Sequence, residues 1–541
     1  MADREYDAVI IGAGAGGGAL AWWLCRAGWQ VLMLERGQDH DRSQYQPDEI
    51  RFQREGALLP DSGELHWVSG SRSQSPTIPS TLGWTASCVG GGTVHMGGFL
   101  YRFHPQDFRM AAEHGETGDL ADWAYDYDSL APYYDLAERE IGVSGDGNPC
   151  FVPRSGPHPM PPVAGHRMAD QLRQASTRLG LTPFATPRSI NSVPYQGRPA
   201  CVKCDACAEF GCAVGAKGSS QESFVRRALA TGRLELRTGT IATELETGAR
   251  DRVEGVVYLD RARGTRHRAR GRLFIVSCSA VESARLLLLS RSGRHPDGLG
   301  NEQGLVGRHL QFHGTTFGSA RIDRQPDWNP MLNVSVADYY LGDGASGELL
   351  KGGMLRFDML ARLPFRRSLQ VLRRNDRILW GKPLLDALAE ELGQCDRIEY
   401  EVFHDFLPSS ETWMSLDENR EDAFGLPAAH IRLGHCPQRQ RTGEILSERA
   451  GEILSEAGAT DIVHDAVGAT SSYLVHGTCR FGSNPETSVL DPWCRVHSMD
   501  NLHVVDGSFM PTSGGSPPTL TIVANALRVG EYLTRGNGRP A

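Results

Sequence analysis

Four cysteines gathered in one short segment form the densest group of metal-binding residue types in the chain. Cys201, Cys204, Cys207 and Cys212 follow one another in the spacing C-x2-C-x2-C-x4-C. Thiolates at such short spacing suit an iron–sulfur cluster or a tetrahedral zinc ion. Of the twelve cysteines the other eight are scattered, so no disulfide framework is expected. Segment 201–212 therefore predicts a metal site, with metal-free thiols or a single disulfide as the alternative.

A glycine motif near the start of the chain has the types and spacing of a dinucleotide site. Gly12, Gly14 and Gly17 stand in G-x-G-x-x-G spacing, and Glu35 follows 23 residues after Gly12. In such a motif the first glycine makes a tight turn, the second lets the backbone approach a pyrophosphate, and the third lets helix and strand pack closely. The acid accepts hydrogen bonds from ribose hydroxyls. The motif alone does not separate FAD from NAD.

These residues need a strand, a helix and a second strand in order, and the flanking sequence supplies them. Residues 7–11 are an apolar run rich in β-branched side chains, which is typical of a buried parallel strand. Residues 19–26 predict a helix whose N-terminus offers free N–H groups to phosphates. Residues 30–34 predict a second strand that ends in Glu35. In this context the motif predicts nucleotide binding rather than a glycine-rich turn without a ligand.

The bulk composition limits the classes of partner. A chain of 541 residues is too long for one compact core, so two or three domains are expected. The net charge of −9 provides no basic field for nucleic acid. No apolar stretch approaches the roughly 18 to 20 residues of a membrane span. The short acidic start does not have the features of a secretory leader, so a cytoplasmic location is expected, with no nucleic-acid or membrane partner.

Further segments along the chain resemble a known family. Residues 89–93 form a second glycine cluster, residues 477–482 read Gly-Thr-Cys-Arg-Phe-Gly, and residues 501–508 end in Val-Val-Asp-Gly-Ser. Together with the N-terminal unit these segments resemble the glucose–methanol–choline (GMC) family of flavin-dependent alcohol oxidases and dehydrogenases. The resemblance implies FAD as the cofactor.

The resemblance also implies flavin contacts from three segments. The second glycine cluster would pass over the flavin ring. His95, which follows this cluster, sits where some relatives carry a histidine bonded covalently to FAD. A covalent bond and a non-covalent contact both stay open. The Val-Val-Asp-Gly strand would end at the flavin, and the last helix would point its N-terminus at the electron-rich side of the ring. The implied residues are Gly91, Thr93, His95, Asp506, Gly507 and Thr519.

The catalytic positions of the family do not match this chain. Oxidation of an alcohol needs a base for the hydroxyl proton while hydride passes from carbon to flavin N5. Where the family usually has a histidine and a second His or Asn, this chain has Leu474 and Pro517. His476 is the nearest replacement, because a shift of two keeps an extended side chain on the same face; a structural histidine is the alternative. Ser516 is expected to hydrogen-bond the substrate, and His404 is a further candidate base or the partner of a nearby acid.

The cysteine segment also has a counterpart in the family. It resembles the segment of sugar-oxidising dehydrogenases in which cysteines hold an iron–sulfur cluster, and it likewise precedes a Gly-Ala pair, at residues 215–216. Simpler relatives have similar stretches without a metal. An iron–sulfur cluster is therefore a possible second cofactor.

The expected fold is α/β, with a Rossmann-like FAD-binding domain of the GMC type and a second, substrate-binding domain built on an antiparallel sheet with helices. The discontinuous FAD-binding domain is expected in residues 1–103, 213–312 and 466–541. Residues 104–200 and 313–465 would form the substrate-binding domain, and 201–212 would lie between the two.

The expected function is the FAD-dependent oxidation of an alcohol to an aldehyde or ketone. The resemblance suggests a primary hydroxyl of a sugar or aminoglycoside-like, polyhydroxylated substrate, as in antibiotic biosynthesis, with oxygen or another electron acceptor. One alternative is a non-redox relative similar to a hydroxynitrile lyase, which the unmatched catalytic pair keeps open. The other is a metal-binding interaction protein that has kept the FAD fold.

Overall fold

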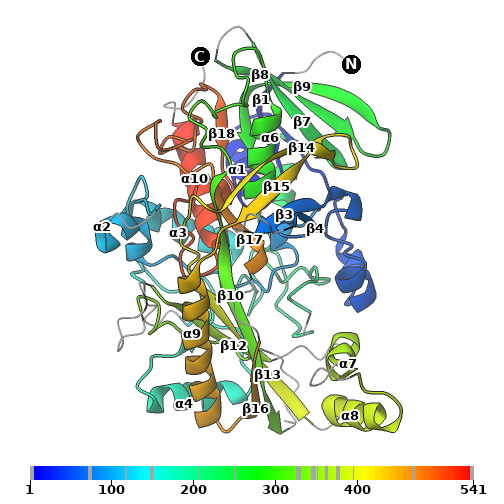
Figure 1. The fold of residues 1–541 in the computed structure, drawn as a ribbon, viewed down its shortest axis with the longest axis vertical. Helices are drawn as coiled ribbons and strands as arrows, with labels where there is room; N and C mark the ends of the chain where they lie inside the picture. The colour runs from blue at the N-terminus through cyan, green and yellow to red at the C-terminus, as the bar shows by residue number, and fades with distance from the viewer. Residues whose placement is uncertain are drawn as a thin grey trace.

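The described residues form two large sheets and one small sheet, arranged along the long axis of the molecule (Figure 1). The computed structural model describes residues 5–535 except for 71–75, 116–118, 147–151, 205, 249–250, 324–330, 343–348, 350, 360–363, 373–377, 394 and 466–469. None of the helices within these ranges is both long enough and apolar enough to cross a membrane.

The first large sheet has a parallel core of five strands in the order β6-β2-β1-β9-β18. β9 is long enough to serve two purposes, since its second half pairs in parallel with β1 and its first half pairs antiparallel with β8. The strands are β1 (Glu5–Ile11), β2 (Val31–Leu34), β6 (Leu234–Arg237), β7 (Thr240–Thr247), β8 (Val253–Asp260), β9 (Thr265–Val276) and β18 (Leu502–Val504). Ala8, Val9 and Ile10 of β1 are fully buried, as their apolar run predicts for a central parallel strand.

Helices from both ends of the chain pack together beside this sheet. α1 (Ala15–Arg26) follows the glycine turn and packs on α10 (Thr519–Thr534), which in turn packs on α3 (Tyr127–Ile141). α6 (Ala280–Leu289) follows β9. Figure 1 shows α1, α6 and α10 in the upper half of the molecule, near both termini. The two ends of the sequence thus build one unit, as the family resemblance implies.

The second large sheet is antiparallel and lies in the lower half of Figure 1. Its strands are β5 (Phe184–Ala185), β10 (Arg308–Asp323), β11 (Val334–Val336), β12 (Gly353–Met359), β13 (Cys395–His404), β16 (Thr460–His464) and β17 (Thr470–Thr478). One face packs against α4 (Met168–Arg178) and α9 (Pro437–Glu456), where Leu355 and Val402 join Leu446 in a buried apolar cluster. Residues of the opposite face line the cavity described below.

The small sheet joins two distant segments of the chain. β3 (His66–Gly70) and β4 (Ile78–Ser80) pair with the hairpin of β14 (Trp413–Glu421) and β15 (Pro427–Leu433). The remaining helices are α2 (Met110–His114), α5 (Arg226–Leu229), α7 (Pro364–Leu372) and α8 (Lys382–Gly393).

The predicted fold class is confirmed, since a Rossmann-like parallel sheet stands beside an antiparallel sheet with helices. The predicted domain boundaries stay a proposal. β10 crosses the predicted boundary at residue 312, and β17, which falls in the predicted FAD-binding range 466–541, pairs with β10. The boundary at residue 466 lies outside the described residues.

Candidate active site

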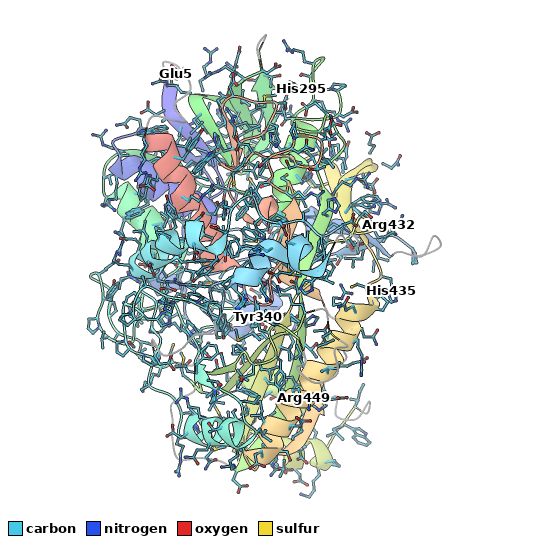
Figure 2. The ribbon with its side chains drawn as sticks, turned by 90° about the vertical axis from the view of Figure 1, so that its left-hand side faces the viewer. Glu5, His295, Tyr340, Arg432, His435 and Arg449 are labelled. Carbon is cyan, nitrogen blue, oxygen red and sulfur yellow. The ribbon has the colours of Figure 1, made fainter. Side chains whose placement is uncertain are left out.

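One cavity of about 490 Å³ collects residues from both large sheets. Its wall includes Gly12, Gly14 and Glu35 from the first sheet and its turns, and Arg356 and Glu401 from the second. Figure 2 shows the side chains in a view turned by 90°, with Tyr340 near mid-height, where the upper and lower halves of the molecule meet. The cavity therefore has a nucleotide-binding motif on one side and an antiparallel sheet on the other.

Each glycine of the motif has a different environment. Gly12 has a φ of +99°, and a Cβ there would lie 2.2 Å from the carbonyl oxygen of Ser277. A Cβ on Gly17 would lie 2.1 Å from the carbonyl oxygen of Gly12, so Gly17 permits close packing of helix and strand. A Cβ on Gly14 would meet nothing within 4 Å. Gly14 thus leaves open space at the N-terminus of α1, where a pyrophosphate would approach the backbone.

Glu35 stands at the end of β2 and fixes the glycine turn. One carboxylate oxygen accepts a hydrogen bond from the Ala13 N–H at 2.9 Å, and the other accepts one from the Gly37 N–H at 2.8 Å. Burial raises the pKa of Glu35, although these backbone hydrogen bonds act in the opposite direction. The carboxyl group lines the cavity at the place that the motif assigns to a ribose.

The second glycine cluster touches the first. Gly91 and Thr93 form a single turn, and a Cβ on Gly91 would lie 3.0 Å from Gly14 Cα. Thr93 Oγ1 donates to the Gly90 carbonyl at 2.6 Å. His95 lines the same cavity, and burial together with the charge of Lys217 lowers its pKa to about 4. His95 is therefore neutral near pH 7.

The C-terminal motif closes the cavity from another side. Asp506, Gly507 and Thr519 all line it. Asp506 accepts a hydrogen bond from the Ser508 N–H at 2.9 Å, and it also accepts one from the Ser283 hydroxyl. Thr519 begins α10, so the positive end of that helix borders the cavity. An electron-rich group bound there would be stabilised.

The two predicted catalytic residues lie behind the cavity wall. Leu474 and Pro517 line the cavity, whereas His476 and Ser516 are fully buried and are not among the described residues that line it. A Cβ on Gly507, a residue of the wall, would lie 3.7 Å from His476 Cα. Burial lowers the pKa of His476 well below the usual range, so its ring is neutral.

His313 of β10 is a buried histidine that sequence reasoning missed. Its ring centroid lies 5.0 Å from that of His476, with the two planes at 85°. Burial lowers the pKa of His313 to about 4, although Asp405 and the backbone of His404 and Ser516 act in the opposite direction. His313 thus lies near both predicted catalytic residues. His404 is itself buried and is not among the described residues of the cavity wall.

The cysteine segment, residues 201–212, borders the cavity and is hydrogen-bonded to Lys217. Cys207 lines it, while Cys204 is exposed and Cys201 and Cys212 are half-buried. Lys217 donates to the carbonyl oxygens of Cys207, Phe210 and Met96 at 2.7, 2.8 and 3.0 Å. No three His, Cys, Asp or Glu side chains within the described ranges are grouped as metal ligands.

Comparisons with known proteins identify the family of the chain. Residues 7–315 and 408–526 match the N-terminal and C-terminal parts of the family described as GMC oxidoreductase. The paromamine 6'-oxidase of Streptomyces fradiae is 38% identical over 97% of this chain and 91% of its own length. The 6'''-hydroxyparomomycin C oxidase of Streptomyces lividus is 36% identical over 98% of this chain and 92% of its own.

A solved structure supports the fold. The pyridoxine 4-oxidase of Mesorbium loti superimposes with a TM-score of 0.65 and 17% identity, over 97% of this chain and 98% of that one. With most of its length matched by the family and two relatives above 30% identity, the chain belongs to the GMC oxidoreductases.

Proposed function

We propose that the protein binds FAD and oxidises a hydroxyl group of a polyhydroxylated, aminoglycoside-like substrate to a carbonyl. The observation that carries this proposal is the open space beside the Gly14 backbone. Gly14 lines a cavity whose other wall is formed by residues of the antiparallel sheet. The named relatives support the substrate class, since two of them are oxidases of paromamine and hydroxyparomomycin C.

The residues of the cavity fit FAD. Gly12, Gly14 and Glu35 would hold the adenosine diphosphate part, while Gly91, Thr93, His95, Asp506, Gly507 and Thr519 would surround the flavin. Gly17 would act through packing. When bound, FAD would supply the acceptor for the hydride that leaves the carbinol carbon.

The protein itself must accept the hydroxyl proton. His476 is proposed as that base, and its support is a neutral ring beside the cavity wall. His476 does not reach the cavity surface, so the proton would pass to it from the cavity through an intervening group. Ser516, buried near His313, is proposed as a hydrogen-bonding partner on this route.

The iron–sulfur cluster rests on the spacing of the four cysteines alone. Because no ligand group is formed among the described residues, no electron-transfer step is assigned to Cys201, Cys204, Cys207 or Cys212. The electron acceptor is proposed to be oxygen or another electron acceptor, and the cytoplasmic location stays a prediction.

One observation favours a second function. The two wall positions that usually carry catalytic side chains are held by Leu474 and Pro517, neither of which can move a proton. A non-redox relative in which FAD is structural would have no need of them. Anaerobic mixing of the FAD-loaded protein with paromamine separates the two. Bleaching of the flavin supports oxidation, and a flavin that stays oxidised with paromamine and related amino sugars would favour the non-redox function.

A further inference from the structure

The second sheet turns a charged face toward the cavity. β12 and β13 pair so that Arg356 lies opposite Glu401 and Asp358 opposite Glu399, and all four side chains line the cavity. Since side chains alternate along a strand, the intervening residues Phe357 and Tyr400 point to the opposite face, where they belong to the buried apolar cluster with α9. The charged groups are therefore confined to the cavity face.

The ion pairs on this face leave Glu401 Oε1 without a hydrogen-bond donor among the described residues. Arg356 donates from Nε at 3.2 Å and from Nη2 at 2.6 Å, both to Glu401 Oε2. Asp358 accepts from Arg356 Nη1 at 3.0 Å, from Arg188 and from the Leu332 N–H at 3.0 Å. No donor within the described part of the chain reaches Glu401 Oε1. Arg188 and Arg356 pair with Asp358 and Glu401, and Glu399 adds a further carboxylate to this wall of the cavity.

A second polar atom beside it is also unpaired. Arg188 lines the cavity and is 2% exposed, and its Nε has no acceptor among the described residues. The guanidinium carbons of Arg356 and Arg188 lie 3.9 and 4.6 Å from the centroid of the Phe99 ring, which holds both groups in place. An unpaired donor in a buried position costs free energy until a ligand oxygen accepts from it.

This charged wall is close to the reacting end of the cavity. Phe99, which carries both guanidinium groups, packs with Leu474 and Phe403 in one apolar cluster. Leu474 holds one of the two wall positions where the family places catalytic groups.

We infer that Glu401, with Glu399 beside it on the same strand, binds an ammonium group of the substrate while Arg188 Nε binds one of its hydroxyl or ether oxygens. This inference rests on the proposed function and narrows it to alcohols that also carry an amine. An ammonium ion supplies a charged donor for Glu401 Oε1, and a carboxylate in a cavity is stabilised when its oxygens are hydrogen-bonded and paired with positive charge. An amino sugar offers both kinds of group on one rigid ring.

The test is calorimetric binding of paromamine, and of paromamine with its amines acetylated, to the FAD-loaded protein. We expect the acetylated compound to bind roughly 10-fold more weakly or worse, the scale of a charge-assisted hydrogen bond. Glu401→Gln should weaken binding of paromamine by roughly the same factor and leave the acetylated compound within about 2-fold. Glu418→Gln, at an exposed position, is the matched control and should change neither affinity.

Several results would overturn the inference: no binding of paromamine, equal affinities of the parent protein for both compounds, or an unchanged preference in Glu401→Gln. If Glu401→Gln does not fold, Glu399→Gln carries the same test with the same expected loss. Because affinity is measured anaerobically and flavin bleaching is followed as a separate readout, a protein that binds paromamine but never bleaches its flavin contradicts the proposed function and leaves this inference standing.

Discussion

The imidazole of His476 lies edge-on to that of His313, with 5.0 Å between the ring centroids. Both rings are fully buried, and neither nitrogen of His476 has a hydrogen-bond partner among the described residues. Burial lowers the pKa of both, so each is neutral near pH 7 and able to accept a proton. His476, which the sequence indicates as a candidate base, thus contacts His313, which the sequence does not indicate.

The first prediction concerns this pair. His476→Ala should keep FAD but slow flavin reduction by an alcohol roughly 100-fold or more, the scale of removing a general base. Because the neutral ring accepts the proton and its pKa is low, the parental rate should stay level from pH 8 down and fall only as the pH approaches that low value. Stopped-flow absorbance under anaerobic conditions measures both effects.

His313→Ala should slow the same step, since it removes the only ring that contacts His476 within the described structure. His404→Ala is the control, because His404 is buried near His313 but makes no contact with His476 among the described residues. A parental rate in His476→Ala would place the base elsewhere.

The second prediction concerns the glycine cradle. Gly14→Val should fold normally and lose FAD, because its side chain enters open space that the pyrophosphate needs. Gly12→Ala should instead destabilise the whole domain, because its Cβ meets the Ser277 carbonyl at 2.2 Å and its φ is +99°. Gly28→Ala is the control for backbone strain, since Gly28 has a φ of +92° with nothing within 4 Å. Flavin absorbance and thermal melting separate loss of the cofactor from loss of the fold.

The third prediction concerns the cysteines. If they hold an iron–sulfur cluster, anaerobically purified protein contains iron and acid-labile sulfide, and replacing Cys204 and Cys207 with Ser removes both. If they hold no metal, the same double variant leaves the iron content near zero and the rate of flavin reduction unchanged. Elemental analysis decides between these outcomes, and bound zinc would show in the same measurement.

The sequence indicated the nucleotide half of the molecule well, because its signals are local. Gly12, Gly14 and Gly17 lie within a few residues of one another, so the motif can be recognised from their spacing alone. The charged wall could not be predicted in the same way. Arg356 and Glu401 are 45 residues apart and meet only through the pairing of β12 with β13. His313 likewise becomes notable only because β17 returns to pair with β10 and places His476 beside it.

The last prediction concerns Lys351, which is buried between two carboxylates. Its ammonium group donates to Asp107 and, at 2.8 Å, to Asp405, and its side chain is 2% exposed. Burial alone would lower the pKa of Lys351, but the two carboxylates outweigh burial and raise it. A raised lysine pKa means that this contribution to stability is complete below the unfolded value and lost only above the folded one, so it is constant across neutral pH.

The ion-pair network of Lys351, Asp107 and Asp405 also connects to the cavity wall through Tyr340. Tyr340 donates to Asp107 at 2.6 Å and accepts from the Gly515 N–H at 2.9 Å, so the network reaches the loop that ends at Pro517 on the cavity wall. Lys351→Met should leave Asp107 and Asp405 as uncompensated buried charges and lower stability by about 3 to 5 kcal/mol. Lys382→Met is the matched control, because Lys382 is 83% exposed and pairs only with Asp386 at 2.9 Å in the described structure. Thermal melting at pH 7 should show a much lower melting temperature for Lys351→Met than for the parent protein. The melting temperature of Lys382→Met should match that of the parent. Equal melting of the two variants would mean that Lys351 contributes no more than a surface ion pair.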